Sequence, residues 1–334
     1  MLSKRLGIDL GTANSLVYLV GSGVVLNEPT VVAVTAEEGK VVAVGNEARE
    51  MLGRTPGNIV ASRPMRDGVI ADYVVTEAML RYFLDRVCGA NRFWKPEVMI
   101  CVPAGVTQVE RRAVLEATLS AGAKTAYLID EPLAAAIGAK IPIAAPSGNM
   151  IVDIGGGSTE AAVISMGGVV AHKSARVAGN KLDEAILTYV KRKYNLIIGE
   201  RTSEEIKITI GTAVPLEKPL AMEVRGRDSI SGLPRMVNVS SDEICEALQQ
   251  PLSQIGTAVK GVLEDTPPEL AGDIIDRGIV LSGGTSLLKN IDKYLTQVTG
   301  VPCHVAEEPL LCVVRGCGLA MENIDLYRRS VMRK

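Results

Sequence analysis

The sequence predicts an α/β protein made of two related halves with a cleft between them. Short buried strands alternate with helical segments along the chain, and this alternation is typical of α/β folds. Three motifs of the first half also recur in the same order in the second half. The 334 residues are enough for about two domains, each with its own core.

The first half is expected to open with a strand meander and to continue with alternating helices and strands. Apolar runs between turn residues indicate the strands, and apolar residues at helical spacing indicate the helices. Pro132 stands near the start of the last helix, where proline is favoured. The expected elements are strands over residues 6–10, 15–20, 24–26 and 30–34, a helix over 76–87, a strand over 98–102, a helix over 108–121, a strand over 126–129 and a helix over 132–139.

The second half is expected to follow a linker over residues 141–148, which contains proline, glycine and serine. The expected elements are a strand over residues 150–154, a turn over 155–158, a strand over 161–165 and a strand over 279–281. The last strand leads into Gly283-Gly284 and a helix, much as the strand over residues 98–102 leads into a helix in the first half.

Two further echoes make the repeat specific. Asp9-Leu10-Gly11 and Asp153-Ile154-Gly155 each end a strand, and Ile129-Asp130-Glu131-Pro132 is echoed by Ala306-Glu307-Glu308-Pro309 before a helix. The two pairs are separated by 144 and 177 positions, so the second half must contain an insertion. Residues 182–239 would supply it.

Composition excludes several classes of function. The chain has 36 basic and 38 acidic residues, so a strongly basic surface for nucleic acid is not expected. No apolar run reaches the roughly 18–20 residues that a membrane span needs, and no signal peptide is recognised. Six cysteines without a C-x-x-C pair, together with two histidines, favour incidental thiols over a metal site or Cys–His catalysis.

The paired Asp–Gly turns suggest a phosphate site in the cleft. Backbone N–H groups of glycine turns bind phosphate, and a turn from each half would hold a phosphate chain from both sides. Hydroxyls of Thr12 and Ser158 and the Asn14 amide add donors, whereas Asp9 and Asp153 would hold Mg²⁺ or its waters. The P-loop and dinucleotide-binding motifs are absent. The alternative for either turn alone is an ordinary hairpin.

Several long motifs closely resemble the MreB family of bacterial actin-like, cell-shape-determining proteins, which includes the Mbl paralogues. They are Gly7-Ile8-Asp9-Leu10-Gly11-Thr12-Ala13-Asn14, Leu26-Asn27-Glu28-Pro29, Gly53-Arg54-Thr55-Pro56-Gly57-Asn58, Arg63-Pro64-Met65-Arg66-Asp67-Gly68-Val69-Ile70-Ala71-Asp72 and Asp153-Ile154-Gly155-Gly156-Gly157. The resemblance runs almost end to end. It implies the actin, heat-shock chaperone and sugar kinase fold, an ATP cleft, and slow ATP hydrolysis coupled to polymerisation.

The resemblance also implies four subdomains and a set of partners. The subdomains would be IA (residues 1–33, 66–146 and 307–334), IB (34–65), IIA (147–180 and 241–306) and IIB (181–240). The implied cofactors are ATP or ADP and Mg²⁺. The implied assembly is a head-to-tail filament in the cytoplasm, at the inner face of the membrane, where cell-wall elongation proteins would be partners in guiding peptidoglycan synthesis. Nucleic acid is not an expected partner.

Site roles follow from the resemblance position by position. The first phosphate loop would contain Asp9, Thr12, Ala13 and Asn14, and the second would contain Asp153, Gly155, Gly156 and Gly157. The nucleoside-contacting helix would contribute Glu204 and Lys207. The adenosine motif would consist of Gly283, Gly284, Thr285 and Ser286. Glu131 would position the attacking water. Ser158 stands where the family usually has threonine, and because serine rotates more freely about χ1, hydrolysis would be slower.

Other functions remain open at this point. A filament-forming structural paralogue with little or no ATPase activity is the main alternative, because a glutamate before proline at a helix start, as at Glu131, is also a favourable helix charge. A sugar kinase would need a sugar-binding wall, and a chaperone ATPase would need a peptide-binding domain. The sequence offers no candidate for either.

An adjacent aromatic pair, Phe93 and Trp94, is unusual in a chain with 3% aromatic residues. It lies in an expected loop, flanked by Arg92 and Lys95. Aromatic side chains flanked by cations suit an anionic membrane interface, and some MreB proteins have a hydrophobic loop in the corresponding subdomain. The alternative is a pair buried in the core.

Overall fold

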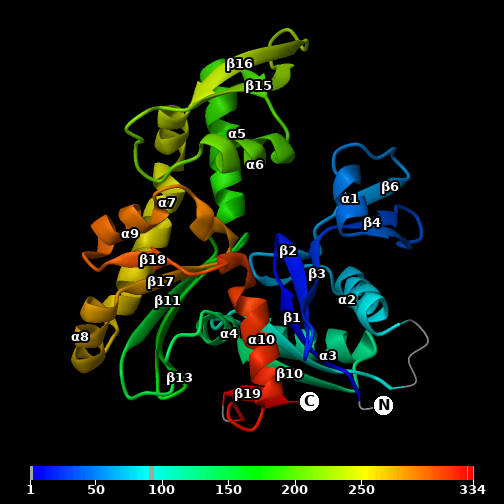
Figure 1. Ribbon diagram of the computed structural model, residues 1–334. Coiled ribbons are helices and arrows are strands. Elements are labelled where there is room, and N and C mark those ends of the chain that lie inside the picture. The colour runs from blue at the N-terminus through cyan, green and yellow to red at the C-terminus, as the bar shows by residue number, and fades with distance from the viewer. Residues whose placement is uncertain (1–2, 90–93, 329, 334) are drawn as a thin grey trace.

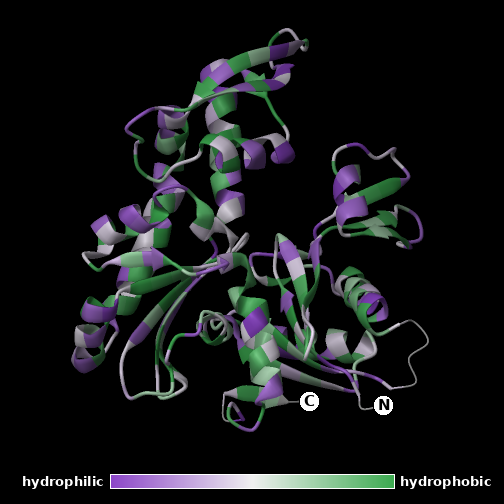
Figure 2. Cartoon of the chain, viewed as in Figure 1, coloured by the Kyte–Doolittle hydropathy of each residue, from purple (hydrophilic) through white to green (hydrophobic). Residues whose placement is uncertain are grey.

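The structure is a computed structural model that describes residues 3–89, 94–328 and 330–333. Its centre consists of two mixed β-sheets, one from each half of the chain, with helices packed around them (Figure 1). Figure 2 shows hydrophobic residues along the central strands, whereas outer helices also carry hydrophilic residues.

The sheet of the first half combines parallel and antiparallel strands. Its strands are β1 (Arg5–Leu10), β2 (Asn14–Leu19), β3 (Gly23–Pro29), β9 (Glu97–Val102), β10 (Thr125–Asp130) and β19 (Val331–Arg333). They lie in the order β19-β10-β9-β1-β2-β3. β1, β9 and β10 are parallel, so their carboxyl ends meet at one edge of the sheet, and β2 and β3 complete an antiparallel meander with β1.

The sheet of the second half repeats this arrangement. Its strands are β11 (Asn149–Ile154), β12 (Thr159–Ser165), β13 (Gly168–Ala175), β17 (Ile279–Ser282) and β18 (Cys303–Val305). The order β13-β12-β11-β17-β18 matches β3-β2-β1-β9-β10 strand for strand, including the antiparallel meander and the parallel strands. The predicted repeat of two related α/β halves is therefore confirmed.

Each half carries a smaller lobe, inserted at the equivalent point after its meander. The first lobe contains β4 (Val32–Thr35), β5 (Val41–Val44), α1 (Asn46–Met51) and β6 (Ile59–Ser62), and the second contains α5 (Gly179–Tyr194), β14 (Leu196–Ile197), α6 (Glu200–Ile210), β15 (Ala221–Asp228) and β16 (Pro234–Ser240). In Figure 1 these lobes stand at the right and at the top. The second lobe contains the predicted insertion.

One strand prediction is wrong in its placement. The sequence predicts that residues 30–34 continue the meander, but β4 pairs with β5 and β6 in the first lobe. The Thr30 hydroxyl donates to the Gly11 carbonyl at 2.7 Å, and the Thr30 N–H donates to the Ala13 carbonyl at 2.9 Å. These bonds tie Thr30 to the first Asp–Gly turn, and the chain leaves the sheet there.

The remaining elements cover the two sheets or connect them. They are β7 (Met65–Arg66), β8 (Val69–Ile70), α2 (Tyr73–Cys88), α3 (Gln108–Ser120), α4 (Glu131–Gly138), α7 (Ser241–Glu264), α8 (Pro268–Arg277), the 3₁₀ helix η1 (Gly284–Leu287), α9 (Ile291–Thr299), the 3₁₀ helix η2 (Pro309–Leu311) and α10 (Cys312–Glu322). α3 and α7 begin with capping boxes, in which Thr107 and Ser240 pair reciprocally with the glutamate three residues later.

Two helices join the halves at the base of the molecule. α4 and α10 pack against each other, and α4 also contacts β11 and β12 while α10 contacts β1 and β9. A Cβ on Gly138 would lie 1.8 Å from the Cys312 carbonyl oxygen, and one on Gly316 would lie 1.7 Å from the Ala134 carbonyl oxygen. The helix backbones therefore touch, and glycine is required at both positions.

Candidate functional site

Three acidic side chains converge where the two sheets face each other. Asp9 lies near the end of β1 and Asp153 near the end of β11, and both are buried, with 9% and 2% exposure. Glu131 is the first residue of α4 and is partly buried. The matching positions of β1 and β11 in their sheets therefore bring together carboxylates that are far apart in the sequence.

The electrostatics of this cluster reflect its burial. Burial raises the pKa of Asp9 to about 7, and the nearby charge of Asp153 adds to the rise. Burial raises the pKa of Asp153 to about 6, although a hydrogen bond from the Ser282 hydroxyl opposes the rise. Burial, Asp153 and Asp9 together raise the pKa of Glu131 well above its usual value. A nearby cation would favour the ionised forms of these carboxylates and oppose the rise in their pKa values.

The two glycine turns lie in direct contact. A Cβ on Gly156 would lie 2.6 Å from the Ala13 Cβ, and one on Gly157 would lie 2.5 Å from the Thr12 hydroxyl oxygen. Only glycine allows this approach. The two predicted phosphate loops, one from each half, are thus brought face to face beside the acidic cluster.

Neighbouring segments fix both turns. The Thr12 hydroxyl accepts a hydrogen bond from the Gly68 N–H at 3.0 Å, which leaves its own proton free to donate. Gly155 N–H donates to the Ser158 carbonyl at 3.0 Å, and the Thr285 hydroxyl donates to the Gly155 carbonyl at 2.7 Å. Asn14 opens β2 immediately after the first turn.

Ser158 and Gly68 also meet at the site. Ser158 is buried, with 7% exposure, and its hydroxyl lies 3.0 Å from the position of a Cβ on Gly68, whose φ is +81°. The same glycine donates to Thr12, so Gly68 contacts both predicted phosphate loops. A larger residue there would strain the backbone and push on Ser158.

The predicted adenosine motif adjoins the second turn. Gly283 has a φ of +83°, and a Cβ there would lie 2.3 Å from the Ile154 carbonyl oxygen. The Ser286 hydroxyl donates to the Gly283 carbonyl at 2.6 Å and holds the tight turn before Gly284. Thr285 connects this motif to Gly155, as described above.

On the predicted nucleoside-contacting helix, Lys207 is held by a partner that the sequence did not reveal. Lys207 Nζ donates to Asp183 Oδ2 at 2.8 Å and to the Gly179 carbonyl at 3.1 Å. Asp183 Oδ1 is buried and accepts no hydrogen bond from the described part of the chain. Burial raises the pKa of Asp183 to about 6 against the opposing charge of Lys207. A ligand hydroxyl would satisfy the orphaned oxygen.

Glu204, predicted to contact the nucleoside, forms a different contact in the structure. Its Oε2 accepts from Arg49 Nη2 at 2.7 Å, and both side chains are partly exposed. Arg49 lies on α1 and Glu204 on α6. This ion pair therefore joins the first lobe to the second across the opening between them.

A further buried acid, Glu160, was also missed. It lies in β12 with 1% exposure, accepts from the Ser174 hydroxyl, and accepts from the Ala104 N–H at 3.3 Å. Burial raises its pKa to about 7. The available signal was a single charged residue beside the apolar run of residues 161–164, a pattern that requires buried hydrogen-bond partners.

The acidic cluster fits a hydrated cation. Within the described ranges, no three His, Cys, Asp or Glu side chains are arranged to hold a metal ion directly. Mg²⁺ keeps several waters and takes one or two carboxylates together with phosphate oxygens. Asp9 and Asp153, which are buried beside the glycine turns, suit that mode of binding.

Comparison with known proteins decides the family. The family described as MreB/Mbl protein matches residues 3–329. The chain belongs to the MreB/Mbl family. It is 53% identical to the cell shape-determining protein Mbl of Bacillus cereus, over 100% of both chains, and 54% identical to the cell shape-determining protein MreB of Escherichia coli, over 98% of this chain and 96% of that one.

Solved structures of MreB proteins share the fold over nearly the whole chain. The structure of MreB5 of Spiroplasma citri bound to ADP has a TM-score of 0.92 and 38% identity, covering 98% of each chain. The same protein bound to AMPPNP has a TM-score of 0.93 and 39% identity. A MamK double helical filament is similar in fold, with a TM-score of 0.82 and 21% identity. The actin-like fold class expected for an MreB-family chain is thus confirmed.

The aromatic loop of this family member is described only in part. Phe93 and Arg92 lie outside the described residues. Trp94 is 65% exposed, so it is not part of the core, and Lys95 beside it is also exposed. Lys4 Nζ donates to the Val87 carbonyl at 2.8 Å, which places a further cation at the end of α2. Among the described helices, none is both long and apolar enough to cross a membrane.

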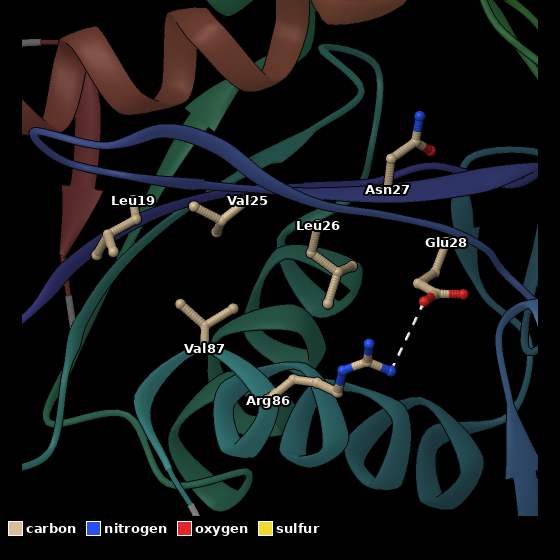
Figure 3. Close-up of a pocket in the computed structure, with 7 residues that line it drawn as sticks. All are labelled: Leu19, Val25, Leu26, Asn27, Glu28, Arg86 and Val87. Atoms are coloured by element: carbon tan, nitrogen blue, oxygen red, sulfur yellow. Dashed lines mark ion pairs between the residues drawn. The ribbon is translucent and has the colours of Figure 1, made fainter.

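Two surface hollows lie apart from the acidic cluster. One, of about 320 Å³, is lined by β2, β3 and the end of α2, where Glu28 and Arg86 approach to 3.9 Å (Figure 3). The other, of about 580 Å³, lies between the segment after α4 and the strands β17 and β18. Neither is lined by a residue that the sequence predicted for the site.

Proposed function

We propose that this MreB/Mbl chain binds and hydrolyses ATP with Mg²⁺ and assembles into head-to-tail filaments that organise cell-wall synthesis and rod shape. The observation that carries the proposal is the contact of two glycine turns, one from each half, beside two buried aspartates and the partly buried Glu131. Relatives named cell shape-determining proteins and the nucleotide-bound MreB5 structures support it.

In this proposal the predicted site residues divide among phosphate binding, cation binding, hydrolysis and nucleoside binding. The Thr12 hydroxyl, the Asn14 amide and the N–H groups of residues 156–158 bind phosphate oxygens. Asp9 and Asp153 would hold Mg²⁺ through its waters, and a bound Mg²⁺ would supply positive charge beside the phosphates. Glu131 orients the attacking water and accepts its proton, with the Ser158 hydroxyl nearby. Lys207, Glu204 and the 283–286 motif contact the nucleoside.

We also propose the four-subdomain division stated above, with the first lobe as IB and the second as IIB, around the nucleotide. The filament would work in the cytoplasm, peripheral to the inner face of the membrane, with cell-wall elongation proteins as partners. The MamK filament shares only the fold at 21% identity, so self-association rests on membership of the family.

Asp153→Ala is expected to abolish the Mg²⁺-dependent part of ATP binding. Loss of a carboxylate that holds the hydrated ion should weaken binding in Mg²⁺ by roughly 10- to 100-fold, whereas binding in EDTA should not change. Fluorescent-nucleotide titrations measure both, and Asp265→Ala, at an exposed aspartate paired with Lys173, is the matched control. An unchanged response to Mg²⁺ in Asp153→Ala would exclude Asp153 from the cation site.

Sedimentation in the presence of ATP and Mg²⁺ tests the assembly itself. Wild-type chain is expected to pellet in a nucleotide-dependent manner and to release phosphate. Pelleting without phosphate release would support the structural paralogue instead. Equal pelleting with and without nucleotide, together with no detectable ATP binding, would contradict the whole proposal.

Phe93→Ala/Trp94→Ala is expected to abolish co-sedimentation with phosphatidylglycerol vesicles while ATP binding persists. Trp94 is exposed beside Lys95, and each cation near an anionic surface adds about 1 kcal/mol. A single loop binds weakly, so polymerisation should strengthen binding by multiplying contacts. Ile275→Ala, at a side chain of similar exposure (64%), and phosphatidylcholine vesicles are the controls. If the double variant still pellets with the anionic vesicles, the loop is not the anchor.

A further inference from the structure

Glu160 occupies a position where a charged side chain is costly. It lies on β12 in the five-stranded sheet of the second half, opposite Asp153 on β11 and Ser174 on β13, and it is 1% exposed. A buried carboxylate is stable only when its oxygens accept hydrogen bonds. Of its two bonds to described residues, one comes from Ser174 within the same sheet and the other from the backbone of Ala104 in the opposite half.

The loop that contains Ala104 connects this contact to the candidate site. This loop, residues 103–105, follows β9 directly. Pro103 Cγ lies 2.8 Å from the position of a Cβ on Gly68, the same glycine that Ser158 approaches. A Cβ on Gly105 would lie 3.2 Å from the Ser174 Cβ. The loop therefore lies tightly between the meander of the second half and the residues that contact both glycine turns.

The other side of the loop is held from the first half. The Ala104 carbonyl accepts from Arg111 Nη2 at 3.3 Å, and the same nitrogen donates to Asp130 Oδ1 at 2.6 Å. Asp130 directly precedes Glu131 at the start of α4. Ala104 is thus fixed through its N–H by Glu160 and through its carbonyl by Arg111, which also holds the residue beside Glu131.

We propose that Glu160 is a positioning residue that fixes the 103–105 loop by holding Ala104. Because Ala104 also contacts Arg111, and Arg111 holds Asp130, the same contact fixes the position of Glu131 relative to Ser158. This inference rests on the proposed ATPase function. Glu160 need not touch nucleotide. Its effect on the rate comes from alignment, which is sensitive because a displacement of about 1 Å can cost roughly 100-fold in rate.

Glu160→Ala and Glu160→Gln separate position from charge. Alanine removes the acceptor for Ala104, whereas glutamine still accepts from Ala104 through its carbonyl and donates to Ser174 through its amide. We expect Glu160→Ala to slow phosphate release roughly 10- to 100-fold with ATP affinity within about twofold of wild type. Glu160→Gln is expected to restore the rate. Ser174→Ala, which removes the other hydrogen bond but keeps Ala104 in place, is the matched control and should stay close to wild type.

Two kinetic results would overturn the proposal. Unchanged phosphate release in Glu160→Ala would show that the contact does not affect alignment. A Glu160→Gln variant as slow as Glu160→Ala would show that the charge of Glu160 matters, not its place.

Amide hydrogen exchange at Ala104 makes the test independent of hydrolysis. Faster exchange in Glu160→Ala than in wild type or Glu160→Gln supports the proposed contact, and equal exchange in all three overturns it. If wild-type chain releases no phosphate, the proposed ATPase function fails, and the exchange measurement still decides the role of Glu160.

Discussion

Glu131→Ala is expected to slow phosphate release by roughly 100-fold or more, the usual effect of losing a positioned general base. ATP affinity should change little, because the proposed phosphate and cation contacts lie on the two glycine turns and the aspartates. Filaments of the Glu131→Ala variant should therefore persist longer than wild-type filaments, because the variant consumes its bound ATP more slowly. Phosphate release and light scattering, followed in the same sample, measure both effects.

A matched glutamate tests the simpler explanation for Glu131. Glu269 lies in the first turn of α8, which like α4 has a proline in its first turn, and it is exposed. If Glu131 were only a favourable helix charge, Glu131→Ala and Glu269→Ala would both leave phosphate release unchanged. Each variant would then lose only about 0.3–1 kcal/mol of stability.

Ser158→Thr is expected to preserve or raise the rate of phosphate release, because threonine is more restricted about χ1.

Gly316→Ala is expected to destabilise the protein by about 3 kcal/mol or more, at or above the upper end of typical overpacking penalties. A Cβ at this position would lie 1.7 Å from the Ala134 carbonyl oxygen, which is backbone and cannot rotate away. The α4 and α10 helices would have to separate, and the core between the halves would open with them. Urea unfolding of wild type and variant measures the difference.

Gly272→Ala is the matched control for this prediction. Gly272 lies inside α8, and a Cβ there would meet nothing within 4 Å. Alanine is the better helix former, so this variant should gain about 0.5–1 kcal/mol. Equal stability of the two variants would mean that the α4–α10 contact can relax at little cost.

The parts of the fold that the sequence predicted are those with strong local signals. Asp9 and Asp153 each end an apolar strand before a glycine turn, and this pattern is complete within a few residues. The strand order that makes the halves equivalent then brings these turns together. The placement of residues 30–34 failed because an apolar strand looks the same whichever sheet it joins, and the Thr30 bonds that redirect the chain are tertiary.

The missed residues depend on contacts that no local pattern contains. Asp183 pairs with Lys207 from another helix, and Glu160 bonds to Ala104 in the other half. The sequence predicted a nucleoside contact for Glu204 but not its ion pair with Arg49, which is 155 positions away. Gly316 also gave no local signal, because a glycine inside a helical pattern does not reveal that a second helix backbone lies against it.

The chain connectivity of the first half has a consequence for its folding during synthesis on the ribosome. β1 packs against α10, where a Cβ on Gly7 would lie 2.5 Å from the Gly318 nitrogen, and Arg5 Nη1 donates to the Met321 carbonyl across 316 positions. β11 to β18, by contrast, occupy one continuous stretch of chain. Chains emerge at about 5–20 residues per second, and domains generally form as their residues become available. The second half can thus assemble while translation continues, whereas the part of the first sheet that α10 covers, including β1, stays exposed until α10 has been synthesised.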